Sequence, residues 1–468
     1  MRILWLCNFM PPAAARQLGQ AYTNKEGWIS GLLGMVMKKQ RENAVLLATA
    51  FPVSLESGLI RKREEIFQDA VTVEKGTLYC YGFYEDSFRP EKYDEGLEER
   101  LGKIIRDFKP DIVHCFGTEY PHTLAMCRVF PKKKRLLIGI QGLCAVYANA
   151  YLAHLPRSVV GSVTLRDFLK RDSITRQQRK FIQRGRMEKE AVKLAGNVTG
   201  RTAWDRHYSS EWNPNAVYYS MNETLRENFY EGSWKEEFCI PHSIFLSQGD
   251  YPIKGLHYML RALPFIKRKY PDVKVFVAGN NLTAYGTLKE RLKISSYGKY
   301  LRSLIRQEGL DGQVEFLGKL NAEEMKERYL SSHLFVCCST IENSPNSLGE
   351  AMLLGMPCVS ADVGGIPSIF RNGEDGILYR GFRTSCNSFD RTGGEGTEDS
   401  EEVADKGEKG LSAVSRRLAE AVLEIWADRE KAVQYCSSAR EHAAKTHDRE
   451  KNYRRLLDIY TNIMEGTL

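Results

Sequence analysis

The stretch LFVCCSTIENSPNSLGEAMLLGMPCVS, residues 334–360, contains a strand, a helix and a second strand in quick succession. The apolar run 334–338 predicts a buried strand, residues 347–354 have the pattern of a helix, and residues 357–360 predict the next strand. Strands and helices that alternate in this way are typical of a parallel sheet covered by helices. This stretch therefore indicates an α/β fold.

The same alternation runs through the chain in two series. The first series has expected strands at 3–6, 44–48, 77–81, 112–114, 136–140 and 197–200. The second has them at 243–247, 273–278, 314–317, 334–338 and 357–360. We predict two Rossmann-like domains that face a cleft, 1–235 and 236–448, with the terminal helix 449–468 as a candidate to complete the first. Ligands of such sheets bind beyond the carboxyl ends of the strands.

The composition limits the class of protein. Of 468 residues, 43% are hydrophobic and 27% are charged, which excludes a wholly disordered or fibrous chain. No run of about eighteen apolar residues predicts a membrane span, and residues 1–8 look like a buried strand rather than a signal peptide. Residues 384–410 are rich in Gly, Ser and acids, so we expect a disordered surface insertion there.

The eleven cysteines and nine histidines are scattered, and no CxxC spacing occurs. An unpatterned set of cysteines in a long chain indicates reduced thiols in a cytoplasmic protein. The same scatter argues against a structural zinc site.

The net charge of +8 is unevenly distributed. Residues 156–187 hold nine bases and two acids, 9 − 2 = +7, interleaved with Leu, Phe, Ile and Val. One interpretation is peripheral docking on the inner face of an anionic membrane. A solvated basic helix, or a rim that binds an acceptor phosphate, is an equal alternative. Nucleic-acid binding is disfavoured because no recognised module accompanies the charge.

Two acids flank the predicted helix start in residues 334–360. Glu342 follows the strand, and Glu350 lies in the first helical turns. Free N–H groups at a helix N-terminus suit a diphosphate, and carboxylates accept hydrogen bonds from sugar or ribose hydroxyls. The pattern therefore predicts a site for a sugar joined to a diphosphate. Alternatively, Glu342 is a solvated loop acid and Glu350 helps to cap the helix.

Two further loops follow strands of the second series. Lys254-Gly255 occupies a strand-to-helix turn, where a lysine can neutralise phosphate, although most lysines are simply solvated. Gly364-Gly365 follows a later strand and would permit a close approach between backbone and ligand, although paired glycines also mark ordinary turns.

These stretches resemble the retaining glycosyltransferases of family four, whose fold, GT-B, has two Rossmann-like domains. The matching residues are Glu342 and Glu350 of an E-x7-E motif, Lys254-Gly255, Gly318 and Gly364-Gly365, and the match extends to about Tyr379. The resemblance implies that Glu342 holds the donor sugar and Glu350 the ribose. It implies that Lys254 and the amides around Asn346, Ser347 and Leu348 hold the diphosphate. Gln248 and Ser368 stand where the family usually has a basic and an acidic residue.

The first domain matches more loosely, and its acceptor side is assigned from fewer residues. It lacks the GxGxxG sequence of a dinucleotide-binding loop. The family often has a histidine where this chain has Gln141, which we assign to substrate positioning. Gly27 and Arg201 are further acceptor-side candidates, Arg201 alternatively forming an ion pair at a domain interface. His114, Glu119 and His122 are alternatives for the same side, and each also fits a structural role.

The resemblance implies a metal-independent transferase without a cofactor. It would move a sugar from a nucleotide sugar to a glycan or lipid-linked acceptor, with retention of configuration, in the synthesis of a bacterial surface polysaccharide. The alternative is a catalytically silent nucleotide-sugar-binding protein, because Gln248 and Gln141 replace expected groups. A sugar phosphorylase of similar fold would usually need a pyridoxal-binding lysine, for which the sequence offers no context.

Overall fold

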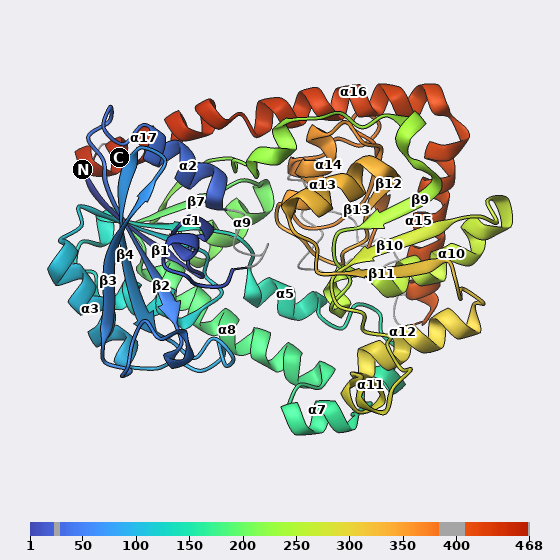
Figure 1. Cartoon of the computed structure of the whole chain (residues 1–468), viewed down its shortest axis with the longest axis horizontal. Helices are drawn as coiled ribbons and strands as arrows, with labels where there is room; N and C mark the ends of the chain where they lie inside the picture. Colours follow the sequence, from blue (N-terminus) through green and yellow to red (C-terminus); the bar gives the residue numbers. More distant parts are fainter. Residues whose placement is uncertain (23–28, 383–407, 467–468) are drawn as a thin grey trace. The chain divides into compact units, whose positions relative to one another are not determined.

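A computed structural model of the chain describes residues 1–22, 29–382 and 408–466 (Figure 1). It forms two compact units. The first comprises Met1–Ala145, Lys180–Glu227 and Thr446–Leu468, and the second comprises Val146–Arg179 and Asn228–Lys445. Residues 146–179 thus belong to the second unit, whereas the sequence placed them in the first domain. Most of the predicted insertion 384–410 lies outside the described residues, and its last three residues, 408–410, begin a helix.

The first unit contains an eight-stranded sheet with the order β3-β4-β2-β1-β5-β6-β7-β8 in its described part. Neighbouring strands are parallel except for β3 and β4, which are antiparallel. The strands are β1 (Arg2–Cys7), β2 (Leu46–Val53), β3 (Ile66–Val73), β4 (Gly76–Tyr84), β5 (Ile112–Phe116), β6 (Leu136–Gly139), β7 (Asn197–Gly200) and β8 (Val217–Ser220). The sequence did not predict β3 and β8, which are the two edge strands.

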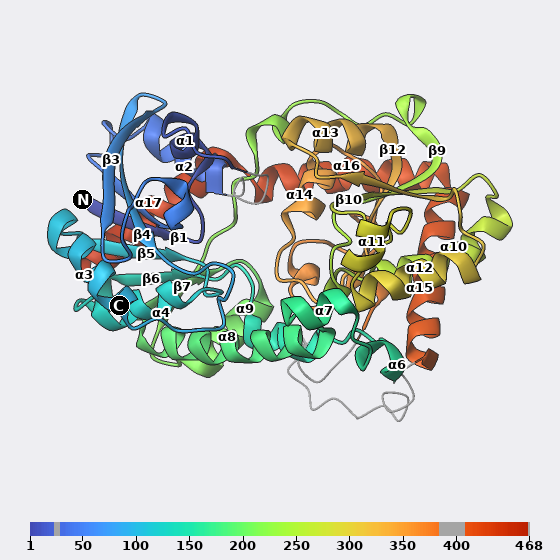
Figure 2. The same cartoon turned by 60° about the horizontal axis from the view of Figure 1, so that its bottom comes forward.

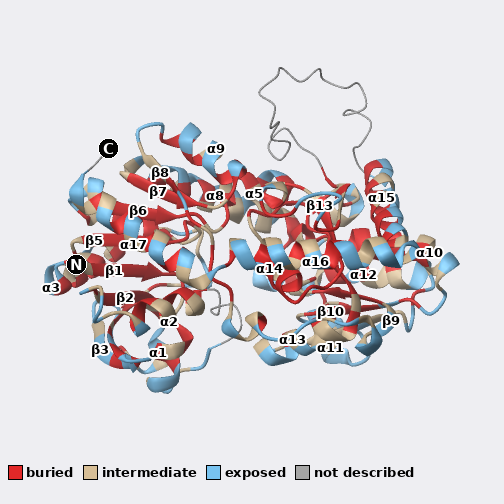
Figure 3. Ribbon diagram, turned by 90° about the horizontal axis from the view of Figure 1, so that it is seen from above, coloured by how far each residue is buried: buried red, intermediate tan, exposed pale blue. Residues whose placement is uncertain are grey.

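The helices of the first unit cover this sheet. They are α1 (Pro12–Gln17), α2 (Ser30–Lys38), α3 (Gly96–Phe108), α4 (Pro121–Val129), α9 (Ala203–Trp212) and α17 (Arg449–Glu465). Two of the boundaries between the units fall within α5 (Cys144–Ala150) and α8 (Ile174–Leu194). Figure 3 shows that the strands consist largely of buried residues, whereas the outer sides of helices such as α3 are exposed.

The terminal helix α17 is part of the core of the first unit. Its apolar residues Leu456, Ile459 and Ile463 are buried in the same cluster as residues of β1 and α2. The phenol of Tyr460 is also buried: its oxygen accepts a hydrogen bond from Trp5 Nε1 at 2.8 Å and lies 2.9 Å from His114 Nδ1. This chain of polar contacts ties α17 to β1 and β5.

Among its described residues, the second unit contains a six-stranded parallel sheet with the order β11-β10-β9-β12-β13-β14. Its strands are β9 (Ile240–Leu246), β10 (Lys274–Ala278), β11 (Val314–Gly318), β12 (Ser332–Cys337), β13 (Cys358–Asp362) and β14 (Ile377–Arg380). Its helices are α6 (Arg157–Val160), α7 (Leu165–Lys170), α10 (Leu256–Lys269), α11 (Leu288–Lys293), α12 (Ser296–Gln307), α13 (Ala322–Ser331), α14 (Asn346–Leu353), α15 (Glu408–Ala427) and α16 (Arg429–Thr446).

The strand order of the second unit sets its binding position. Strands run outward from β9 to β11 on one side, and the chain then crosses to β12 and continues to β14 on the other. Such a reversal opens a crevice between the loops that follow the two central strands, here β9 and β12, and ligands of open α/β sheets bind there. The first unit has the same kind of reversal between β1 and β5.

No helix in the described ranges is both long and apolar enough to cross a lipid bilayer.

Replacing Tyr460 with Phe should destabilise the first unit by about 1–3 kcal/mol, because the buried Trp5 indole N–H loses its acceptor. Denaturant unfolding measures this change. Thr461→Ala on the exposed face of the same helix is the control and should stay within about 0.5 kcal/mol of the native protein. Equal effects of the two substitutions would show that the polar contacts of Tyr460 do not hold α17 in place.

Candidate functional site

The loops after β9 and β12 are joined to each other at the reversal point of the second sheet. The amide of Thr340 donates to the carbonyl of Ile253 at 2.7 Å. Cys338 Sγ lies 3.4 Å from the carbonyl of Lys254. Because β9 and β12 are adjacent strands, these contacts fix where the loop side chains point.

An ion pair links the two loops. Lys254 Nζ lies 2.6 Å from Glu342 Oε1, and the same carboxylate oxygen accepts a hydrogen bond from Ser339 Oγ at 2.8 Å. The two charged side chains are only 19% and 10% exposed. Burial alone would lower the pKa of Lys254, but the Glu342 carboxylate outweighs it and raises that pKa above its ordinary value. Lys254 is therefore a fixed cation at neutral pH.

Two glycines permit the close approach of backbone that builds this ion pair. Gly255 has φ +71°, and a Cβ atom there would lie 1.8 Å from the carbonyl oxygen of Cys338. Gly364 has φ +56°, and a Cβ atom there would lie 2.1 Å from the carbonyl oxygen of Glu342. The next amide, of Gly365, donates to that same carbonyl at 2.9 Å. Only glycine fits at 255 and 364 without moving Glu342 or Lys254.

The N-terminus of α14 begins four residues after Glu342. Pro345 precedes it, and the first turn has no side-chain cap. The amide of Leu348 is taken by the carbonyl of Pro345 at 3.0 Å, so it cannot serve a ligand as predicted. Within the described ranges the amides of Asn346 and Ser347 have no acceptor, and Asn346 Oδ1 is buried without a partner. Donors at a helix N-terminus attract anions.

The remaining predicted donor residues lie at different distances from this point along the sheet. Glu350 is buried one helical turn after Asn346, on the same face of α14. Gln248 follows the end of β9 by two residues and is half-buried. Gly318 ends β11, two strands away from β9, where its carbonyl accepts a bond from the Gly279 amide at 2.8 Å. It is therefore separated from the ion pair by β10.

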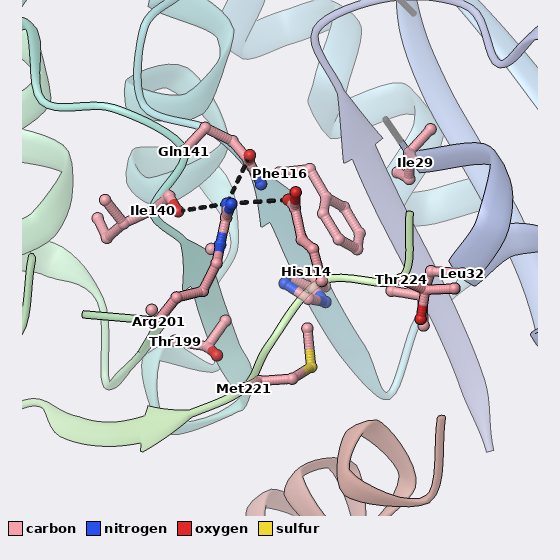
Figure 4. A pocket seen from close by; sticks show the side chains of 13 residues that line it. Ile29, Leu32, His114, Phe116, Ile140, Gln141, Thr199, Arg201, Met221 and Thr224 are labelled. Carbon is pink, nitrogen blue, oxygen red and sulfur yellow. Dashed lines mark hydrogen bonds and ion pairs between the residues drawn. The ribbon is translucent and has the colours of Figure 1, made fainter. Parts of the chain in front are cut away.

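The first unit has a pocket of its own, beside the carboxyl ends of β6 and β7 (Figure 4). One guanidinium nitrogen of Arg201 contacts Gln141 Oε1 at 2.6 Å, the carbonyl of Ile140 at 3.1 Å and Glu223 Oε1 at 2.9 Å. The structure thus brings the predicted residues Gln141 and Arg201 together. The ion partner of Arg201 is Glu223 of the same unit, so the alternative of an ion pair at a domain interface is not needed.

His114 lines the same pocket from the middle of β5, not from the strand end as the sequence predicted. Its side chain is fully buried, and this lowers its pKa to about 3, so the imidazole is neutral at physiological pH. Its Nδ1 is engaged with Tyr460, whereas its Nε2 is buried without a partner. Gly139 leaves room beside that nitrogen, because a Cβ atom there would lie 3.1 Å from it.

Several other polar atoms of this pocket are buried and unmatched. They are Thr199 Oγ1, Thr224 Oγ1 and Glu223 Oε2. Buried polar groups almost always have partners, so a cluster of unmatched ones indicates space for a polar ligand or water. The sequence analysis predicted no individual role for these side chains, because a single threonine or glutamate near a strand end is not part of a recognisable motif.

The alternatives His122 and Glu119 form a separate network. His122 Nδ1 lies 2.7 Å from Glu85 Oε2, and His122 Nε2 lies 3.1 Å from Asn8 Oδ1. The side-chain Nδ2 of Asn8 donates to Glu119 Oε2 at 3.1 Å. Since both ring nitrogens of His122 have partners, this histidine has a structural role. Gly27 lies outside the described residues.

Within residues 1–22, 29–382 and 408–466, no group of three His, Cys, Asp or Glu side chains is placed to hold a metal ion. The ten cysteines in these ranges are free thiols.

We expect Gly255→Ala to disrupt the contact between the loops after β9 and β12, because the new Cβ atom would overlap the Cys338 carbonyl. Gly373→Ala is a matched control: Gly373 has φ +75°, but a Cβ atom there meets nothing within 4 Å. Both variants carry the cost of the left-handed backbone, about 1–2 kcal/mol. Only Gly255→Ala should lose substantially more stability on denaturant unfolding. Similar losses would mean that the loop contact is loose.

His114 should make stability fall with acidity. Its unfolded-state pKa is near 6.5 and its folded-state pKa is about 3, so its contribution is present above pH 6.5 and is lost as pH falls toward 3. Between pH 7 and pH 5, His114→Asn should reduce the loss of unfolding free energy by about 2 kcal/mol. Exposed His207→Asn should leave the native slope unchanged. If the unfolding free energy of the His114 variant depends on pH as strongly as that of the native protein, the buried His114 imidazole is not the group that causes the dependence.

Comparison with known proteins finds a family match within the second unit. Residues 242–383 match the family described as glycosyl transferases group 1. An uncharacterized glycosyltransferase of Methanocaldococcus jannaschii is 29% identical over 154 residues, which are 31% of this chain and 36% of that protein. The chain spans only 28% to 36% of the length of the first curated relatives it matches.

Solved structures resemble the whole chain. Sucrose-phosphate synthase of Thermosynechococcus elongatus superposes with a TM-score of 0.62 at 12% identity and covers 100% of both chains. The Anabaena protein HepE, in complex with UDP-glucose, superposes with a TM-score of 0.60 at 13% identity over 99% of this chain and 100% of its own. The predicted fold and family resemblance are thus confirmed. Residues 242–383 match the glycosyl transferases group 1 family, and the chain has the GT-B fold of two Rossmann-like domains.

Proposed function

We propose that this protein is a retaining glycosyltransferase that moves a sugar from a nucleotide sugar to a glycan or lipid-linked acceptor. The observation that carries the proposal is the ion pair of Lys254 and Glu342 at the reversal point of the second sheet. These groups lie in the loops after β9 and β12 and suit such a donor: the cation and the unpaired amides of α14 suit the diphosphate, and the carboxylate suits the sugar hydroxyls. The complex of HepE with UDP-glucose supports this donor class.

Lys254 and α14 would stabilise the leaving group. When the bond between the anomeric carbon and the diphosphate breaks, negative charge develops on the phosphate oxygens. Lys254 Nζ and the amides of Asn346 and Ser347 are in place beforehand, and donors that need no rearrangement lower the barrier most. This positive charge can take the place of a divalent metal. Glu342 would exchange its lysine contact for sugar hydroxyls, and Glu350 would hold the ribose.

The acceptor would bind in the pocket of the first unit. The charge of Arg201 is balanced by Glu223, so the unmatched groups that remain are hydroxyls, a carboxylate oxygen and the neutral His114 imidazole. These groups favour a ligand rich in hydroxyls. Gln141 is held by Arg201 and cannot accept a proton, so it positions the acceptor instead of acting as a base.

Retention would follow from attack on the face that the diphosphate leaves. The acceptor oxygen forms the new bond to the anomeric carbon as the carbon–phosphate oxygen bond breaks, and the leaving phosphate oxygen takes the acceptor proton. No protein nucleophile is needed. We place this reaction in the assembly of a bacterial surface polysaccharide, on the cytoplasmic side, where free thiols persist.

Lys254→Met and Glu342→Gln should each lower kcat/KM for a nucleotide sugar by at least about 100-fold. Release of nucleoside diphosphate from a panel of nucleotide sugars measures this activity, and thermal shift selects the donor that binds. Lys274→Met, at the amino end of β10, is the control and should keep native activity.

The double variant Lys254→Met/Glu342→Gln removes both charges and leaves no unpaired buried charge. If it unfolds at the native temperature but lacks activity, the loss of activity is not caused by unfolding. Native-like activity in either folded single variant would refute this site. A native protein that is stabilised by a nucleotide sugar but never releases diphosphate would instead support the silent binding protein.

A further inference from the structure

The short helix α7 exposes its apolar side. Leu165, Phe168 and Leu169 are spaced i, i+3 and i+4, which places them on one helical face. Their side chains are 54%, 67% and 69% exposed, and the preceding Val163 is 57% exposed. Surface helices normally turn such a face toward the core, so α7 is oriented the opposite way.

A buried acid holds α7 in this orientation. Asp167 is 1% exposed, and its Oδ2 accepts hydrogen bonds from the amide of Ser296 at 2.8 Å and from Ser296 Oγ at 2.6 Å. Thr164 caps the helix and donates from Oγ1 to the carbonyl of Ile294 at 2.8 Å. The polar side of α7 is thus fastened to the start of α12, and its apolar side must face outward.

The neighbouring helix α11 repeats the pattern. It lies beside α7 in both views of the chain (Figures 1 and 2). Leu288 and Leu292, spaced i and i+4, are 73% and 50% exposed, and Tyr285 just before the helix is also exposed. Two helices in contact thus both carry exposed apolar side chains, and we call residues 163–169 and 285–292 together the α7–α11 surface.

The exposed charged side chains in the two segments that form the α7–α11 surface and its flanks are all cations. No acidic side chain is exposed in residues 157–171 or 285–293, because Asp167 is buried and Glu290 is half-buried in the capping box of α11. The same two ranges expose six cations: Arg157, Lys170, Arg171, Lys289, Arg291 and Lys293.

We propose that the α7–α11 surface docks on an anionic lipid bilayer. Exposed apolar side chains that alternate along the chain with exposed cations complement the boundary between acyl chains and anionic headgroups. A protein partner would need a surface both apolar and uniformly acidic. Within the basic stretch 156–187, this docking surface uses α7, and it also includes α11, which lies outside that stretch. It does not depend on the proposed transferase activity.

Sedimentation of the full chain with vesicles tests this docking. The native protein should bind vesicles of phosphatidylcholine mixed with phosphatidylglycerol, and bind phosphatidylcholine alone at least about tenfold more weakly. Phe168→Ser/Leu169→Ser and Lys170→Glu/Arg171→Glu should each weaken binding to the mixed vesicles at least about tenfold. Phe238→Ser is the matched control, because Phe238 is 69% exposed but lies outside the surface, and it should bind as the native protein does.

Failure of the native protein to bind the mixed vesicles would overturn the proposal, and so would native binding by both double variants. Light scattering tests a second copy of the chain as the occupant. If the native protein is an oligomer that Phe168→Ser/Leu169→Ser converts to a monomer, the surface is an interface between copies and the proposal is wrong. All three variants expose polar groups where side chains were already exposed, so their unfolding temperatures should match the native value.

Discussion

The candidate site depends on an ion pair that is held away from water between two adjacent strand ends. Lys254 and Glu342 come from loops 88 residues apart, and they meet because the chain reverses its strand order between β9 and β12. A pair of this kind is favourable only when its geometry is fixed and its remaining hydrogen bonds are satisfied. Ser339 supplies one such bond, and the glycines at 255 and 364 let the backbones approach closely enough to fix the rest.

The two units have the same kind of sheet but different polar groups at the ends of their central strands. In the second, Lys254 and Glu342 form an ion pair four residues before α14, whose first amides have no acceptor, and we propose an anionic donor as their ligand. In the first, Arg201 is likewise paired with Glu223, and the buried atoms without partners are side-chain oxygens and one histidine nitrogen. The contrast follows from the residues at the strand ends, because both sheets have a reversal of strand order.

The sequence predicted most strands and the donor loops, because both are local patterns. It missed β3, β8 and β14, which are edge strands with short or weakly apolar sequences. Residues 146–179 were placed in the wrong unit because long-range bonds decide their place: the carbonyl of Ala153 is bonded by His257 and Tyr258. The unmatched atoms beside His114 and the outward face of α7 also depend on tertiary contacts, which no local spacing reveals.

The most direct measurement of the central claim is a structure of the protein with a bound nucleoside diphosphate, from crystals soaked separately with UDP, GDP and ADP. The account predicts that the phosphates of at least one of them lie within hydrogen-bond distance of Lys254 Nζ and of the Asn346 and Ser347 amides, with the ribose at Glu350. A nucleotide bound elsewhere, with the Lys254–Glu342 pair intact and no ligand density beside it, would contradict the proposed donor site.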